Sequence, residues 1–168
     1  YTIYLDFNGH TVTGTSWNGS NQNNPIHAPA YDINGDIFSF SQTELDRIFE
    51  VWERVSEDFT PFDVDVTTED PGVSLLAQGN RAIRTLISTS VDDTRLGGTG
   101  NAWFDPAGGV AYVGSWSWNS DTPAWVFSNH LGGGVKKVAE ATSHEVGHTL
   151  GLNHDGQTGG VSYYEGHG

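Results

Sequence analysis

The segment 144–155 carries the residues best suited to chemistry, because its three histidines have a spacing that lets them converge on one ion. It reads His-Glu-Val-Gly-His-Thr-Leu-Gly-Leu-Asn-His-Asp. His144 and His148 are four positions apart, so both imidazoles share one face of a helix. Gly151 can leave that helix through a turn of positive φ, after which His154 can return as a third ligand. Three neutral imidazoles with one open coordination position are typical of a catalytic zinc site.

Glu145 directly follows the first histidine, where it can reach a water on the ion without being a ligand itself. The pattern predicts that one zinc ion, held by His144, His148 and His154, lowers the pKa of a bound water to about 7. Glu145 would accept the water proton as general base and return it to the leaving amine as general acid. Asp155 is predicted to be a partner behind the ligands or at the helix end, with a simple Asx turn as the alternative.

Three other interpretations of this segment stay open at the level of sequence. The histidines could lie on a helix surface and bind metal only adventitiously, or the zinc site could have lost its activity. The protein could also be a zinc-containing binding module, in which exposed aromatic residues at 103–104 and 115–118 stack on sugars or hold a partner. A water in the fourth coordination position favours an enzyme, whereas a fourth protein ligand favours a module.

The motif resembles the signature of the metzincin zinc metalloproteases, HExxHxxGxxH. Asp155 directly after the third histidine resembles the reprolysin (adamalysin-like) branch, and the wording HEVGHTLGLxH is similar to bacterial serralysin-type enzymes. The resemblance implies a secreted zinc endopeptidase that hydrolyses peptide bonds of extracellular proteins. Its partners would then be peptide or protein substrates.

The same resemblance assigns a role to the segment Gly109, Val110, Ala111 and Tyr112. It would be the edge strand above the cleft, whose free N–H and C=O groups pair with an extended peptide substrate. An ordinary sheet strand is the alternative.

One departure from the metzincin pattern is large. The family places a methionine in a turn after the third histidine, and this chain contains no methionine. We therefore expect residues 1–168 to be one catalytic domain, mostly its N-terminal subdomain, from a longer or nicked enzyme. A complementary C-terminal chain would then supply the Met-turn. Two alternatives stay open: the chain is an inactive fragment that needs this complementary chain, or the Met-turn is truly absent.

The elements that must position the motif follow from hydrophobic periodicity. Ser41 and Glu44 form a capping-box pattern, and apolar residues then recur every three or four positions up to Phe59, which predicts a helix. A second helix, carrying the metal site, is predicted over 135–150 with Gly151 just after it. Strands are predicted at 1–7, 62–66, 82–89, 110–113 and 124–128, and the residues 8–40 read as a long irregular segment.

This order of strand, helix, four strands and helix predicts the α/β (α+β) fold class. By resemblance, it is a metzincin-like N-terminal subdomain: a five-stranded mixed, twisted sheet with two long helices, the second of which carries the metal site.

Charge and composition narrow the classes of partner. Seven Lys and Arg against 21 Asp and Glu give a net charge of −14. Nucleic acids and anionic membrane surfaces require a basic face, so this balance argues against both and favours cations. There is no cysteine, which excludes a disulfide framework and thiolate chemistry. No apolar run approaches the roughly 18 residues of a membrane span.

Asp32, Asn34 and Asp36 have the 1,3,5 spacing of a calcium loop. Position 6 of that loop is Ile37 and position 12 is Thr43, so it is not an EF-hand. The spacing leaves a structural Ca²⁺ loop of another kind as one prediction and an Asx-rich turn before the helix as the other.

Overall fold

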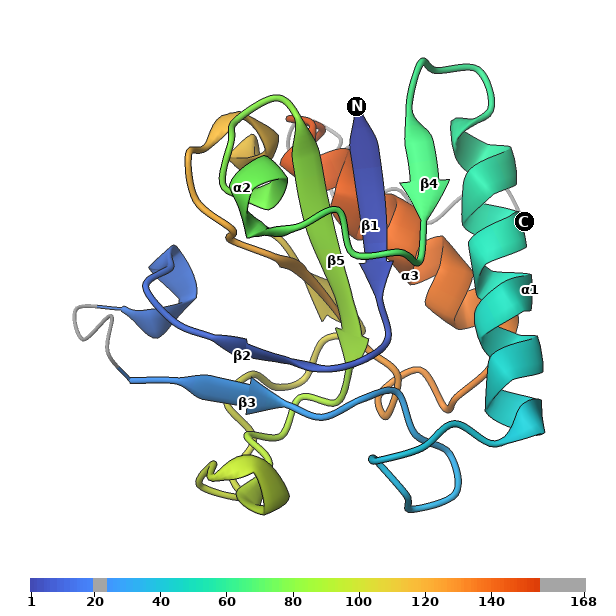
Figure 1. Ribbon diagram of the computed structural model, residues 1–168, viewed down its shortest axis with the longest axis vertical. Coiled ribbons are helices and arrows are strands. Elements are labelled where there is room, and N and C mark those ends of the chain that lie inside the picture. The colour runs from blue at the N-terminus through green and yellow to red at the C-terminus, as the bar shows by residue number, and fades with distance from the viewer. Residues whose placement is uncertain (20–23, 155–168) are drawn as a thin grey trace, which may run out of the picture.

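A five-stranded sheet runs through the centre of the computed structural model, which describes residues 1–19 and 24–154 (Figure 1). The strand order is β4-β1-β5-β7-β6. Four strands are parallel, and β6 is antiparallel to its neighbour β7 and forms one edge. The strands are β1 (Thr2–Asp6), β4 (Asp65–Thr67), β5 (Ala82–Ser88), β6 (Gly109–Val110) and β7 (Ala124–Phe127). The predicted α/β fold with a mixed five-stranded sheet is confirmed.

Two long helices, α1 (Gln42–Phe59) and α3 (Val135–Thr149), pack against each other and against one face of this sheet. Val138 and Val146 of α3 are completely buried in the core between them. Burial of each such side chain stabilises the fold by about 1.5–3 kcal/mol. The buried residues of α3 recur every three or four positions, so one face of the helix must lie against the core, and this determines how the helix is rotated about its axis. The residues beside that buried face, which include His144 and His148, then face β6.

The opposite face of the sheet is covered by a hairpin in a segment that the sequence predicts to be irregular. β2 (His10–Val12) and β3 (Ile26–Ala28) pair antiparallel, so the prediction of an irregular segment over 8–40 is wrong there. Val12, Ile26 and Ala28 pack against Leu86, Trp125 and Phe127 of the sheet. Each strand has only three residues, which is too short for alternation to show in the sequence.

Two predicted strands have other boundaries. The strand predicted at 62–66 is β4 at 65–67, because the amides of Phe62 and Val64 are engaged in turns after α1. The strand predicted at 110–113 is β6 at 109–110, because the Ser115 N–H bonds to the Tyr112 carbonyl and turns the chain. The short helix α2 (Val73–Leu76) and the 3-10 turns η1 (Ser16–Asn18), η2 (Thr94–Leu96) and η3 (Ser115–Ser117) were not predicted.

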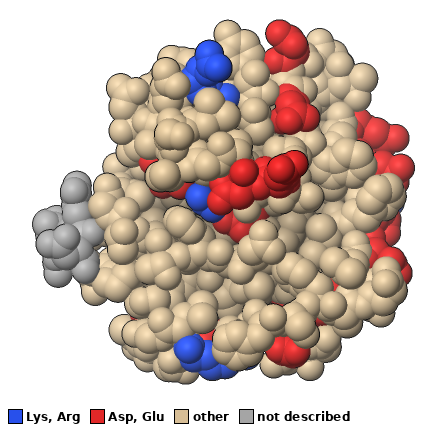
Figure 2. Space-filling model, in the orientation of Figure 1, with Lys and Arg blue, Asp and Glu red and all other residues tan. Residues whose placement is uncertain are grey.

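Acidic side chains gather along the edge of the molecule formed by α1, at the right of Figure 2. The polar face of this helix holds only two arginines against a larger set of acids, which consists of Asp46, Glu50, Glu53, Glu57 and Asp58. In the part of the chain that the structure describes, no helix is long and apolar enough to cross a membrane.

The N-terminus of α1 confirms the predicted capping box and extends it. The Ser41 hydroxyl accepts the Glu44 N–H at 3.3 Å, and the Glu44 carboxylate accepts the Ser41 N–H at 2.7 Å. Glu44 also accepts the N–H of Ile33 at 2.9 Å, although its side chain is fully buried. Burial opposes ionisation of this carboxyl, but the hydrogen bonds outweigh it and hold the pKa of Glu44 below its usual value.

We expect Glu44→Ala to destabilise the protein by about 2–4 kcal/mol, because two backbone amides and a hydroxyl lose their buried acceptor. Urea unfolding measures the change, with Glu53→Ala, an exposed position on the same helix, as the control. The control should stay within about 0.5 kcal/mol of wild type. Equal loss in both variants would contradict the role given to Glu44.

The pH dependence of stability offers a second test of the same carboxylate. Because the pKa of Glu44 is lower in the folded state, its ionisation stabilises the fold above the unfolded pKa of about 4.3, and this stabilisation is lost as the pH falls through the folded pKa. The difference in unfolding free energy between wild type and Glu44→Gln should therefore shrink on acidification from pH 7. A difference that stays constant down to acid unfolding would refute this expectation.

Candidate metal centre

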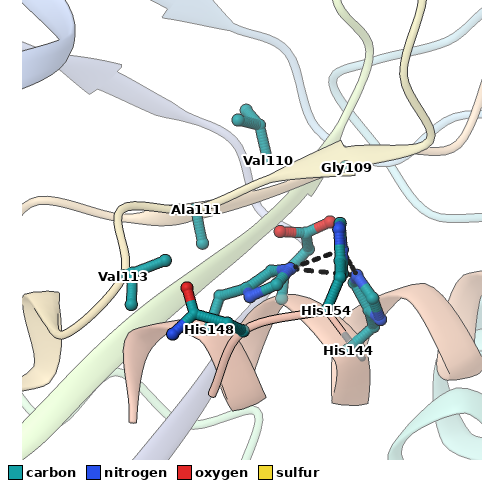
Figure 3. Close-up of a pocket in the computed structure, with 9 residues that line it drawn as sticks. Gly109, Val110, Ala111, Val113, His144, His148 and His154 are labelled. Atoms are coloured by element: carbon teal, nitrogen blue, oxygen red, sulfur yellow. Dashed lines mark hydrogen bonds between the residues drawn. The ribbon is translucent and has the colours of Figure 1, made fainter. Parts of the chain in front are cut away.

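The three histidines of the motif meet at the end of α3, beneath the edge strand (Figure 3). His144 and His148 project from the last two turns of the helix. Gly151 follows at φ 100°. The N–H of Gly151 donates to the His148 carbonyl, and the N–H of Leu152 donates to the Gly147 carbonyl. This pair of bonds is a Schellman motif, in which a glycine reverses the chain. The reversal returns His154 to the other two histidines, as the sequence predicts.

The Nε2 atoms of the histidines form a small triangle. That of His144 lies 2.9 Å from the Nε2 of His154 and 3.0 Å from that of His148, and His148 and His154 are also 3.0 Å apart. Nitrogen ligands of a tetrahedral zinc ion lie about 3.3–3.4 Å apart when the Zn–N distance is about 2.0–2.1 Å. The triangle thus differs from that arrangement by a few tenths of an ångström. Within residues 1–19 and 24–154, no other cluster of His, Asp or Glu could hold a metal.

The protonation of the rings also suits a metal. His148 Nδ1 lies 2.7 Å from the Leu152 carbonyl, which can only accept, so Nδ1 carries the hydrogen and Nε2 presents its lone pair. Burial lowers the pKa of His144, and the charges that His148 and His154 would carry lower it further. The neutral imidazole, which is the form that binds zinc, is therefore favoured.

Glu145 points into the same cleft from the buried side of the helix. Its side chain is 6% exposed, and no described residue donates a hydrogen bond to its Oε2. Burial raises the pKa of Glu145 to about 7. A buried carboxylate oxygen without a protein partner is costly, and a water beside an ion at the histidines would satisfy it. The donor set and this oxygen together fit a zinc ion held by His144, His148 and His154.

The cleft has a volume of about 420 Å³, and the edge strand forms its upper wall. A Cβ on Gly109 would lie 2.7 Å from Oε1 of Glu145, so only glycine lets β6 pass this close to the carboxylate. Val110 points away from the histidines, and Ala111 and Val113 point toward α3 (Figure 3). The lining residues are Gly109, Val110, Ala111, Val113, His144, Glu145, His148, Asn153 and His154.

The side chain of Tyr112 lies outside the cleft, although the predicted pairing of 109–112 with a substrate concerns the backbone and stays a prediction. Its ring lies 4.2 Å from that of Trp17 and 5.3 Å from that of Trp118, and its hydroxyl donates to the Ser16 carbonyl at 3.2 Å. Val113 lines the cleft instead. The alternation of an extended chain, which places 111 and 113 on one side, was the signal that could have found it.

The calcium prediction is not supported. Asp32 accepts the N–H groups of Asn34 and Gly35 at 2.8 and 2.7 Å, and Asn34 accepts that of Asp36 at 2.8 Å. Asp36 in turn accepts the N–H of Phe38 at 2.9 Å. The oxygens are engaged by their own backbone, so the Asx-rich turn is the better interpretation. Asp155 lies outside the described residues.

The aromatic residues that suggested a binding module are half-buried rather than fully exposed. The Trp103 ring lies 4.4 Å from that of Trp125 and 5.7 Å from that of Phe127, and Trp103 and Phe104 are only partly exposed. In the described part of the chain, the metal-binding cluster consists of the three histidines. The packing of the aromatic residues does not favour the module.

The comparison with protein families agrees with this geometry. A family model described as metallo-peptidase family M12B, reprolysin-like, matches residues 58–155, which is more than half of the chain. The chain therefore belongs to the reprolysin-like metallopeptidases of family M12B, a zinc-dependent family of peptidases. This membership confirms the metzincin resemblance. No curated protein matches the chain.

We expect His148→Ala to weaken zinc binding by more than the roughly 10- to 100-fold typical when a residue behind a ligand is changed. Zinc content after dialysis and competition with a chromogenic chelator measure the affinity. His27→Ala is the control, since His27 lies outside the histidine cluster and should leave zinc binding unchanged. Wild-type affinity in His148→Ala would show that the triangle is not the zinc site.

Proposed function

We propose that the protein is an endopeptidase that hydrolyses peptide bonds of extracellular proteins, with zinc held by His144, His148 and His154 and with Glu145 as general base. The observation that carries this proposal is the buried Oε2 of Glu145, to which no described residue donates a hydrogen bond, beside the three converging imidazoles. A surface cluster that binds metal adventitiously would not explain a buried carboxylate beside it.

Glu145 moves the proton in this proposal. When bound, zinc supplies a Lewis acid that activates water and polarises the scissile carbonyl. Oε2 accepts a proton from the attacking water, and Glu145 then delivers that proton to the nitrogen of the leaving amine. Burial supports both steps, because it brings the pKa of Glu145 to about 7 and so makes its two protonation states similar in energy near neutral pH.

The edge strand orients the substrate. An extended peptide can add to the free side of β6, where main-chain hydrogen bonds align it across the cleft. Side chains of such a peptide alternate between the two faces of the sheet. One set would face the side of Ala111 and Val113, and the other the side where Val110 packs near Trp17 and Trp103.

The metzincin resemblance supports two further points of the proposal. The first is that the protein acts outside the cell on extracellular proteins. The second is that residues 1–168 provide the N-terminal subdomain of the catalytic domain and that a complementary chain provides the Met-turn.

Glu145→Gln should retain zinc and lose peptidase activity by about 100- to 10,000-fold, since the amide cannot accept the proton. Hydrolysis of fluorescently labelled casein measures the activity, and metal analysis of the same sample measures zinc. Glu140→Gln, on the exposed side of the same helix, is the matched control and should keep wild-type activity.

Unchanged hydrolysis by Glu145→Gln would overturn the role of Glu145. A wild-type protein that binds zinc but cleaves no peptide bond would overturn the proposal that this chain is an endopeptidase by itself, and would favour the binding module or a fragment that needs its complementary chain.

A further inference from the structure

His130 joins three segments at the point where the edge strand begins. Its Nδ1 lies 2.6 Å from the Ala107 carbonyl, just before β6, and its Nε2 lies 3.0 Å from the hydroxyl of Ser90, which follows β5. His130 itself follows β7. It is absent from the lining of the metal cleft, so it has no direct contact with a substrate there.

The hydrogen bonds of this junction determine the orientation of the ring. The Ala107 carbonyl can only accept, so Nδ1 carries the hydrogen. Nε2 faces the Ser90 hydroxyl, and Oδ1 of Asp105 lies 3.7 Å from the same nitrogen. The Ser90 oxygen in turn accepts from the amide of Asn129 at 3.3 Å, and Asn129 accepts the Ser90 N–H at 3.2 Å. Ser90 is 1% exposed, so this end of the junction is buried, whereas His130 and Asn129 lie at the surface. Both nitrogens of His130 are used, and the ring is held in one position.

Two glycines, Gly108 and Gly109, connect Ala107 with the cleft, because Gly109 is the first residue of β6 and lines the cleft. The Gly108 carbonyl accepts the N–H of Phe127 at 2.8 Å, and a Cβ on Gly108 would lie 2.7 Å from Leu131. A Cβ on Gly109 would lie 2.7 Å from both the Trp125 carbonyl and Glu145. Packing on these glycines prevents the strand from moving inward. The bond to His130 holds the segment before it from moving outward.

We propose that His130 is a positioning residue of the peptidase site, which sets the place of β6 through the Ala107 carbonyl. This inference depends on the proposed function. A peptide long enough to pair with β6 is held in register by that strand, whereas a peptide truncated to the residues beside the scissile bond is not. His130 therefore determines how strongly the enzyme prefers long over truncated peptides.

The test compares two quenched fluorescent peptides, copied from a casein sequence that the wild-type protein cuts. One spans the whole cleft, and the other is truncated around the scissile bond. His130→Phe retains the ring against Phe127, where the centroids are 5.9 Å apart, and loses both hydrogen bonds. We expect its KM for the long peptide to rise by about 10- to 100-fold, with kcat/KM for the truncated peptide within about twofold of wild type.

Two further variants separate positioning from general stability. His130→Asn can restore the N–H donor to the Ala107 carbonyl and should recover most of the affinity for the long peptide. His27→Asn is the matched control, since Nδ1 of His27 also has a single oxygen partner, Asp92 at 3.0 Å, away from the cleft. It should leave the ratio between the two peptides unchanged. An unchanged ratio in His130→Phe, or an equal loss on both peptides, overturns the proposal.

Hydrogen exchange tests whether His130 holds β6 in place, even if the wild-type protein cuts no peptide. The backbone amides of 108–113 should exchange about tenfold faster or more in His130→Phe than in wild type, and at the wild-type rate in His27→Asn. A protein without activity but with this change would refute the proposed function and leave His130 as the residue that holds β6. Unchanged exchange would refute the role of His130 itself.

Discussion

The close contact between the backbone of Gly109 and the carboxylate of Glu145 is the constraint on which the rest of the site depends. It brings the edge strand over the helix at the distance where no side chain fits. The same contact removes Glu145 from water, and this burial raises its pKa. It also places the free edge of β6 above the histidines, so one local approach determines both the chemistry of the carboxylate and the path of a peptide.

That contact requires the sheet and α3 to be in one relative position. Val138 and Val146 determine the rotation of α3, because turning the helix would expose them. With this rotation, Glu145 lies at the border of the buried face, and His144 and His148 lie beside it at the open edge. A histidine pair four residues apart could occur on any helix. The packing of its other face makes this pair point at the cleft.

The parts of the structure that could be predicted are those whose signal is local in the sequence. The capping box at Ser41 and Glu44 and the glycine turn at Gly151 follow from rules that span a few residues, and both were found. The hairpin of β2 and β3 was missed, because it is stabilised by contacts with Trp125 and Phe127, far along the chain. Its strands carry almost no pattern of their own.

The features of the site that the sequence could not show have the same cause. The ring of Tyr112 packs on Trp17, about a hundred positions away, and only tertiary packing decides this. The spacing of Asp32 and Asp36 left a calcium loop and an Asx-rich turn open, and the backbone donors that favour the turn are not revealed by any spacing rule. His130 was not distinguished from other single histidines, because its role depends on Ala107 and Ser90 in two other segments.

The character of the cleft suggests how recognition is divided between backbone and side chains. Among the described residues that line it, those other than Glu145 and the histidines are small, apolar or an amide, and none is a Lys, an Arg or another carboxylate. Such a wall offers few side-chain contacts that discriminate between peptides, so pairing with the backbone of β6 must supply much of the affinity. Substrate affinity would then depend on the position of the two-residue strand β6 relative to the histidines. A junction outside the cleft that holds this strand can therefore matter as much as a residue inside it.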